Sequence, residues 1–201
     1  MDAEPDERLV ARSRDGDLAA FNSLVERYER ALFNLSYRLL GHQQAAEDAT
    51  QEAFLSAFRA IHGFAGGNVR SWLLRIAANE CKDELRRRSR KDHADSLDVM
   101  FDSQEHHVEV ADPGESAEIL VLRAEQASVL NDLLLALPYE QREAIVLIDV
   151  YDFRYEEVAS MTAVSVGTVK SRVHSAVNKL TEAWNEMFPG DPLPAIKAVE
   201  T

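Results

Sequence analysis

The chain has 201 residues, of which 46% are apolar, and a formal net charge of −13. This length permits one or two domains with a real hydrophobic core. The single cysteine excludes a disulfide framework and a cysteine zinc site, and fits a reducing compartment. The acidic start MDAEPDE has no apolar stretch typical of a signal peptide, and no segment reaches the length of a membrane span, so we expect a cytoplasmic protein.

Apolar residues recur at helical spacing along almost every long segment, and none alternates as a strand would, which predicts an all-α protein. The first half is expected to form one small helical bundle, residues 17–91, after an acidic N-terminal extension, residues 1–16. Its three helices are predicted at residues 17–40, which Gly41 closes, at 45–61 and at 69–90.

The second of these helices has two different faces. Its inner face is predicted to carry Ala46, Ala53, Phe54 and Phe58. Its other side has a stripe at positions i, i+3, i+4 and i+7, formed by Asp48, Gln51, Glu52 and Leu55. Two interpretations stay open from the residues alone: a solvated acidic face, or a docking surface for a basic partner helix.

The third helix is basic. Residues 64–91 hold eight Lys and Arg against three acids. Cations near a helix C-terminus complement the helix dipole, but Arg75 and Lys82 lie further up. A basic helix after a Gly-Gly-Asn loop, with Phe64 nearby, suits single-stranded nucleic acid, because aromatic rings and loop pockets take bases while cations follow the backbone. Trp72 falls on the apolar stripe and is expected in the core.

Two segments are expected to lie outside the domains. Residues 92–118 contain nine acids and no Lys or Arg, which predicts a flexible acidic linker. A proline-containing tail, residues 189–201, is expected to fray. The linker histidines lack the spacing of metal ligands, so we expect no metal site and no cofactor; they are His93, His106 and His107.

A second helical domain is predicted over residues 119–188. Apolar periodicity resumes at Ile119, Pro138 interrupts it, and a further helix is expected over residues 140–150. Two short helices with a tight turn follow, and residues 164–180 contain no Asp or Glu. This pattern predicts a helix-turn-helix, because a helix that enters a DNA groove cannot set carboxylates against the phosphates.

Two such domains joined by an acidic linker resemble the extracytoplasmic-function (ECF) group of bacterial sigma factors, over roughly residues 17–184. The resemblance rests on four segments in order: AEDATQEAF (46–54), RSWLLRIAANECKDELRR (70–87), LPYEQREAIVL (137–147) and YEEVASMTAVSVGTVKSR (155–172). It implies a subunit of RNA polymerase that recognises promoters in a stress response, and not an enzyme.

The resemblance also implies partners and site residues. The stripe at Asp48, Gln51, Glu52 and Leu55 would dock on the clamp helices of the largest polymerase subunit, and the second domain on the flap of the second-largest. The −10 element would be captured and melted by Phe64, Asn68, Arg75, Asn79, Lys82, Arg86 and Arg87. The −35 element would be read by Ser165, Thr168, Lys170, Ser171, Arg172, His174 and Lys179. The linker would thread into polymerase channels, and an anti-sigma factor is a further implied partner.

The chain departs from the family pattern at four positions. Ser175 and Val177 stand where the family often has Arg, which removes up to two basic contacts to DNA. Arg154 replaces a usual serine at a helix N-cap, at a cost of about 1 kcal/mol. Ala163 replaces a usual turn glycine. We therefore expect the −35 contacts and the stability of the second domain to differ from the family norm.

Two alternative functions fit the sequence less well. A stand-alone helix-turn-helix regulator with an N-terminal helical sensor domain would not need the basic helix at 69–90. A helical metal-carboxylate hydrolase using Glu47, Asp48 and Glu52 would need a Glu-x-x-His pair, and the sequence has none. It also has no phosphate loop and no nucleophile elbow, so no catalytic residue is expected.

Overall fold

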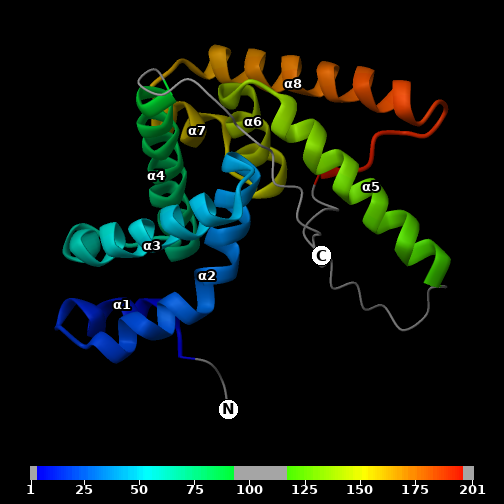
Figure 1. Cartoon of the computed structure of the whole chain (residues 1–201). Helices are drawn as coiled ribbons and strands as arrows, with labels where there is room; N and C mark the ends of the chain where they lie inside the picture. The colour runs from blue at the N-terminus through cyan, green and yellow to red at the C-terminus, as the bar shows by residue number, and fades with distance from the viewer. Residues whose placement is uncertain (1–3, 93–116, 197–201) are drawn as a thin grey trace. The chain divides into compact units, whose positions relative to one another are not determined.

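The computed structural model describes residues 4–92 and 117–196, and the chain divides into two compact units, Met1–Phe101 and Asp102–Thr201. Every regular element within the described residues is a helix (Figure 1). The all-α prediction with two helical domains is confirmed. The predicted acidic linker and its three histidines lie almost wholly outside the described residues, as does the end of the tail.

The first unit contains α1 (Asp6–Arg14), α2 (Leu18–Leu40), α3 (Gln43–Ala60), the 3₁₀ turn η1 (Ile61–Gly63) and α4 (Val69–Asp92). The three predicted helices of the first half are present, with ends within about two residues of those expected. Gly41 ends α2 in the left-handed conformation, φ 70°. The sequence patterns predicted no helix before residue 17, so α1 is an addition.

The core of the first unit lies among α2, α3 and α4, each of which contacts the other two. The buried side of α3 consists mainly of alanines, and these small side chains let the neighbouring helices approach closely. The buried alanines are Ala45, Ala46, Ala49, Ala53 and Ala57. The larger buried side chains come from its neighbours, and include Leu32, Leu35 and Leu39 of α2 and Leu73 and Leu74 of α4. Because its inner face packs closely, α3 holds its opposite face outward.

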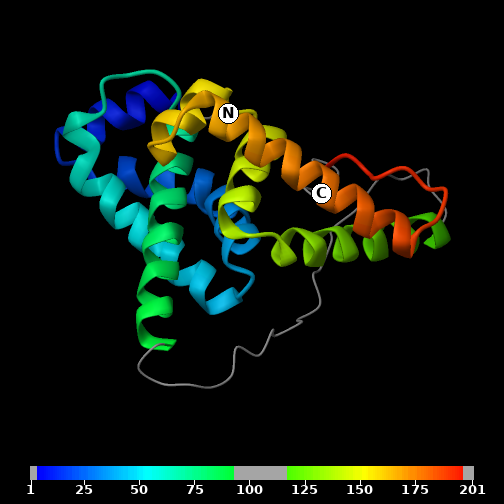
Figure 2. The same cartoon turned by 90° about the horizontal axis from the view of Figure 1, so that it is seen from above.

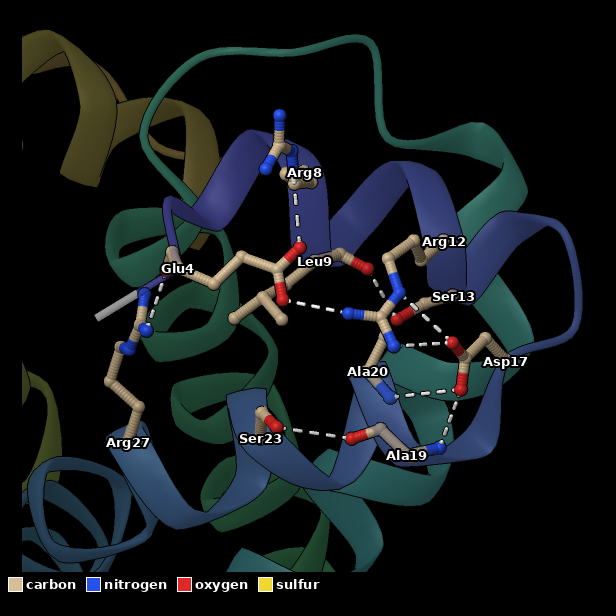
Figure 3. A network of polar contacts seen from close by, with 10 residues as sticks. All are labelled: Glu4, Arg8, Leu9, Arg12, Ser13, Asp17, Ala19, Ala20, Ser23 and Arg27. Carbon is tan, nitrogen blue, oxygen red and sulfur yellow. Dashed lines mark hydrogen bonds and ion pairs between the residues drawn. The ribbon is translucent and has the colours of Figure 1, made fainter. Parts of the chain in front are cut away.

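Helix α1 is joined to α2 by a polar network that Figure 3 shows at close range. Asp17 caps α2, since its carboxylate accepts the N–H groups of Ala19 at 2.9 Å and Ala20 at 3.2 Å. Arg12 of α1 donates to the other oxygen of Asp17 at 2.6 Å and 2.9 Å. The hydrogen bonds from Arg12 and from the capped backbone lower the pKa of Asp17. One carboxylate therefore both begins α2 and binds α1 to it.

A second link joins the start of α1 to the middle of α2. Arg27 donates to the carbonyl of Glu4 at 2.7 Å and pairs with the carboxylate of Asp6. The hydroxyl of Tyr28 also donates to Asp6. Burial, followed by the interaction with Asp6, raises the pKa of Tyr28 to about 12. These links and the buried Leu9 and Val10 hold α1 to the bundle along its length.

The second unit contains α5 (Ala117–Ala136), α6 (Tyr139–Ile145), the π-helical segment η2 (Val146–Val150), α7 (Tyr155–Thr162) and α8 (Val166–Met187). Helices α5, α6 and α7 all contact α8. Figure 2 shows α7 beside the first turns of α8, the arrangement of a helix-turn-helix. The buried face of α8 is formed by Val169, Val173, Ala176, Leu180 and Trp184.

The two departures that bear on stability lie at the two ends of α7. Ala163 has φ 55° and ψ 41°, the left-handed region that favours glycine. At the start of α7, the N–H of Arg154 donates to the carboxylate of Glu157 at 2.8 Å. An arginine side chain cannot accept a hydrogen bond, so only this half of a capping box replaces the missing serine.

Candidate nucleic-acid and protein interfaces

The stripe on α3 is exposed along its whole length. Asp48, Gln51 and Glu52 lie at the surface, and Leu55 is 49% exposed. Phe58 continues this face one turn further on, is 39% exposed and makes an edge contact with Phe21 at 5.0 Å. The prediction that Phe58 lies on the inner face is therefore wrong: alanines fill that face, and the ring packs at its edge. The resulting surface combines two carboxylates, one amide and two apolar side chains.

Four of the predicted strand-binding residues form one stripe on α4. They follow one another at i, i+4, i+7 and i+11, so they share a face of the helix: Arg75, Asn79, Lys82 and Arg86. Arg75, Asn79 and Arg86 are exposed, and Lys82 is half-buried. Arg87 lies about 100° further round the helix and pairs with Glu84 at 3.2 Å. The structure thus does not bring Arg87 together with the other four.

The loop before α4 meets this stripe at Asn68. This residue is exposed, and its side-chain oxygen accepts the N–H of Ser71 at 2.9 Å, which begins the helix. Asn68 precedes Arg75 by seven residues, about two helical turns, so it lies on the same side of α4. Its capping bond uses the amide oxygen, and the amide nitrogen remains a donor for a ligand.

Phe64 behaves differently from the surface aromatic that the sequence indicated. It is only 8% exposed, and its ring centre lies 4.9 Å from that of half-buried Trp72. The ring therefore packs beneath the loop and supports it. The loop residues that remain exposed are Ala65, Gly66, Gly67 and Asn68.

The outward face of α8 is polar and mostly uncharged. Opposite its buried face lie Ser171 and His174, while Ser165, Thr168, Lys170 and Lys179 are also exposed and Arg172 is half-buried. Ser165 begins the helix by accepting the N–H of Thr168 at 3.0 Å. The amine of Lys170 lies 5.9 Å from the centre of the Tyr155 ring. These residues are spread around the outward half of the helix, with the cations at its sides.

Asn178 belongs to this face and was missed by the sequence reasoning. It is exposed, and its amide nitrogen lies 3.2 Å from Nε2 of His174. It follows His174 by four residues and Ser171 by seven, so all three share one side of the helix. That spacing was visible in the sequence, but the segment that carries the resemblance ends at Arg172, before Asn178.

The two positions without the usual arginine are not equivalent. Ser175 and Val177 are both half-buried. Ser175 lies about 40° around α8 from Ser171, whereas Val177 lies about 120° from it, towards the buried face. A side chain at 175 is therefore closer to the outward face than one at 177.

Among the described residues, no group of three or more His, Cys, Asp or Glu side chains could hold a metal ion. Within the same ranges, none of the helices combines the length and apolar character needed to cross a membrane. Asp48 and Glu52, two of the carboxylates that the disfavoured hydrolase would use, are exposed on α3 and do not face inward.

Comparison with known proteins matches both units to sigma factors. Residues 24–91 match the family model described as Sigma-70 region 2, and residues 128–180 match Sigma-70, region 4. The chain is 33% identical to the RNA polymerase sigma-H factor of Pseudomonas aeruginosa over 189 residues, 92% of this chain and 96% of that protein. It is 34% identical to the ECF RNA polymerase sigma-E factor of Escherichia coli K12 over 176 residues, 85% of this chain and 90% of that one.

Solved structures agree. The sigma factor RpoE from Bartonella quintana, in complex with the anti-sigma factor NepR, is 27% identical with a TM-score of 0.66, covering 81% of this chain and 94% of that one. CnrH, solved with the cytosolic domain of CnrY, has the same fold at 23% identity and a TM-score of 0.58. The first unit thus corresponds to a sigma region and not to a sensor domain. The chain belongs to the ECF group of bacterial RNA polymerase sigma factors, which are transcription initiation factors that bind core RNA polymerase and promoter DNA.

Proposed function

We propose that this sigma factor uses the α4 stripe and the adjoining loop to capture and hold the single strand of the −10 element. The observation that carries the proposal is the alignment of Asn68, Arg75, Asn79, Lys82 and Arg86 along one side of α4. An extended strand needs a line of contacts, because successive phosphates and bases follow one another along it. The stripe from Arg75 to Arg86 is about three helical turns long and provides that line.

The residues of this surface divide the work by chemistry. Arg75, Lys82 and Arg86 carry positive charge and hold phosphates, while the amides of Asn68 and Asn79 bind the edge of an unpaired base. Capture of an unstacked base shifts the pairing equilibrium towards open DNA, so melting draws on binding energy and needs no nucleotide hydrolysis. Phe64 supports the loop from below, and Arg87 reaches phosphates at the flank after exchange with Glu84.

The outward face of α8 is proposed to read the −35 element in the major groove. Ser171 and His174, at its centre, meet base edges, as does Asn178, since an asparagine amide pairs well with adenine. The flanking cations Lys170, Arg172 and Lys179 meet phosphates on either side, and Ser165 and Thr168 contact the backbone near the helix start. The second unit docks in addition on the flap of the second-largest polymerase subunit.

The stripe on α3 is proposed to dock on the clamp helices of the largest polymerase subunit. Asp48 and Glu52 supply charge for a basic partner helix, Gln51 supplies hydrogen bonds, and Leu55 supplies exposed apolar area. Exposed apolar side chains beside carboxylates are typical of a protein interface, whereas a merely solvated face would have no need of Leu55.

Binding to polymerase is needed because the free protein is poorly suited to duplex DNA. Residues 123–188 hold six Lys and Arg against ten acids, a net of −4, so long-range attraction to phosphates is absent. The test is a gel-shift on promoter duplex at moderate salt, with the free protein and with core polymerase added. We expect a specific shift only with core polymerase. Nanomolar, sequence-specific binding by the free protein would contradict the proposal.

An anti-sigma factor is proposed as a further partner, since a similar sigma factor was solved in complex with one. Such a partner would hold the protein inactive in the cytoplasm until a stress signal releases it. Co-purification from uninduced and stressed cells tests this: we expect a stoichiometric small partner before stress and core polymerase after it. Core polymerase at equal yield under both conditions would exclude such control.

A further inference from the structure

Arg14, the last residue of α1, reaches across to the start of the loop that precedes α4. Its Nε donates to the carbonyl of Ile61 at 3.1 Å, and its Nη2 donates to the carbonyl of Phe64. The side chain is half-buried. One guanidinium thus joins both ends of the short segment that leads from η1 into the loop. It also places a cation beside carbonyls at the C-terminal end of a helical segment, where positive charge is favourable.

The loop is held at both ends and is free only in the middle. Arg14 and the packing of Phe64 on Trp72 fix its start, and the bond from Ser71 to Asn68 fixes its end. Between them, Gly66 and Gly67 have φ of 97° and 99°, and a Cβ at either position would meet nothing within 4 Å. The short free segment, residues 65–67, therefore depends on its anchors for its position.

The anchor at the start is itself fixed. Helix α1 buries Leu9 and Val10 against the unit, and Arg12, two residues before Arg14, is bound to the cap of α2 through Asp17 (Figure 3). Arg14 therefore fixes the start of the loop relative to α1. It lies outside residues 24–91, the part of the chain that matches Sigma-70 region 2.

We infer that Arg14 is a positioning residue for strand capture, which holds the start of the loop so that Asn68 and the α4 stripe meet the same strand. The inference rests on the proposed role of that loop in capturing a base. Without the guanidinium, the carbonyls of Ile61 and Phe64 lose their donor, and the loop samples more conformations. The apparent affinity for the strand falls in proportion to the fraction of molecules whose loop is correctly placed.

The test uses holoenzyme and two single-stranded −10 oligonucleotides, one intact and one lacking the captured base. The wild type is expected to bind the intact strand more tightly. Arg14→Ala should reduce that preference about tenfold while binding to the abasic strand stays unchanged, because the competent fraction of loops falls and the α4 cations remain. Arg14→Lys, which keeps the charge and one donor nitrogen, should recover part of the preference. Arg8→Ala is the matched control. It removes the same charge from the same helix, but the side chain of Arg8 is 73% exposed.

The salt dependence separates positioning from a direct phosphate contact. Loss of a phosphate contact lowers the slope of log affinity against log salt by about 0.7 for a single strand. Arg14→Ala should leave that slope unchanged, because Nε and Nη2 of Arg14 donate to carbonyls and hold the guanidinium against the backbone. An equal preference for the intact strand in wild type and Arg14→Ala, or a reduced slope, overturns the inference.

A second variant keeps this test apart from the proposed function. Asn68→Asp retains an oxygen that caps α4 but replaces the amide by a carboxylate, which repels the strand. If Asn68→Asp captures the base as the wild type does, the loop is not the capture site and the proposed function fails. If Asn68→Asp is impaired while Arg14→Ala is normal, only the positioning inference fails. Should Arg14→Ala melt before the assay temperature, Arg14→Lys and Arg14→Gln are read by the same criteria.

Discussion

The two proposed DNA surfaces differ in how they combine charge with polar groups. On α4, three cations and one asparagine follow one another along a single stripe, Arg75, Asn79, Lys82 and Arg86. On α8, the centre of the outward face is uncharged, and Lys170, Arg172 and Lys179 lie at its sides. A single strand presents backbone and bases along one line, whereas a duplex groove presents base edges in the middle and phosphates on both rims. Each surface has the charge pattern that its proposed target requires.

The surfaces also differ in the partners of their cations. Arg86 pairs with Asp83 and Arg87 with Glu84, both at 3.2 Å, on the exposed end of α4. Such surface pairs are weak, so phosphates can displace the carboxylates. In α8, no acid occurs before Glu182, and the cations need no such exchange. The proposed −10 surface would therefore become fully basic only on contact with the strand, in an overall acidic protein.

The largest expected effect is a loss of polymerase binding, which would keep both proposed DNA surfaces away from the promoter. Reversing Asp48 and Glu52 to Lys should weaken binding to core polymerase at least about 100-fold, because charges that face a basic partner become repulsive. Both side chains are exposed, so the fold should be retained. Co-purification and titration of labelled core polymerase measure the loss. The control reverses Glu26 and Glu29, which are exposed on α2 and give the same change in net charge. If the α3 double variant co-purifies with core polymerase at wild-type yield, the stripe is only a solvated face and not a docking surface.

The next effect separates the two surfaces from each other. Asn79→Ala removes a base-binding amide without changing charge, so holoenzyme should form a closed complex near normally and open the promoter about 10-fold more slowly, a typical loss for one base contact. Permanganate footprinting measures the opening. A template mismatched across the −10 region should restore activity, since it no longer requires melting. Asn22→Ala, at an exposed position on α2, is the control. Normal opening of paired DNA by Asn79→Ala would remove this residue from the strand surface.

A smaller effect is expected from adding charge to α8. Ser175→Arg places a cation beside the outward face and should tighten holoenzyme binding to the −35 duplex several-fold at low salt, with the salt slope steeper by about 0.9 for one added phosphate contact. The control Asn185→Arg adds the same charge near the other end of the helix. If both variants tighten binding equally, the gain is long-range attraction, and Ser175 does not adjoin the groove.

The sequence predicted the parts of the molecule that periodicity and local charge encode. Three helices of the first unit and the helix-turn-helix follow from apolar spacing, and the α4 stripe follows from basic residues on such a spacing. Helix α1 was missed because its nine residues carry few apolar side chains in an acidic context. Phe58 was placed inside because it is apolar, although the alanine face already packs closely. Composition cannot tell which aromatic ring ends on the surface.

Contacts between distant residues account for the remaining differences. The bonds from Arg14 to Ile61 and Phe64 join positions 47 and 50 residues apart, and no local pattern encodes them. The burial of Phe64 depends in the same way on Trp72, one helix turn into α4. The capping role of Asn68 could be predicted, since asparagine before an apolar helix is typical of an N-cap, and the cap uses only the amide oxygen. Sequence reasoning thus predicted the residues of the proposed strand surface and missed the contacts that hold its loop.

The smallest expected effect concerns the stability of the unit that carries α8. Ala163 lies in the left-handed region at the turn between α7 and α8, where a Cβ costs about 1–2 kcal/mol. Glycine at this position would remove that cost, but it also has more conformational freedom in the unfolded chain, which offsets part of the gain in stability. Ala163→Gly should therefore stabilise the second unit by about 0.5–1 kcal/mol. Hydrogen exchange of the amides in α7 and α8 measures the change within the full chain. Ala136→Gly, in the last turn of α5, is the matched control and should lower stability, because φ there is helical. If both glycines slow or both speed exchange, the left-handed alanine is not the source of the cost. If only Ala163→Gly slows hydrogen exchange, the turn before α8 is strained by its left-handed alanine. The loop before α4 differs, because its left-handed positions are already glycines.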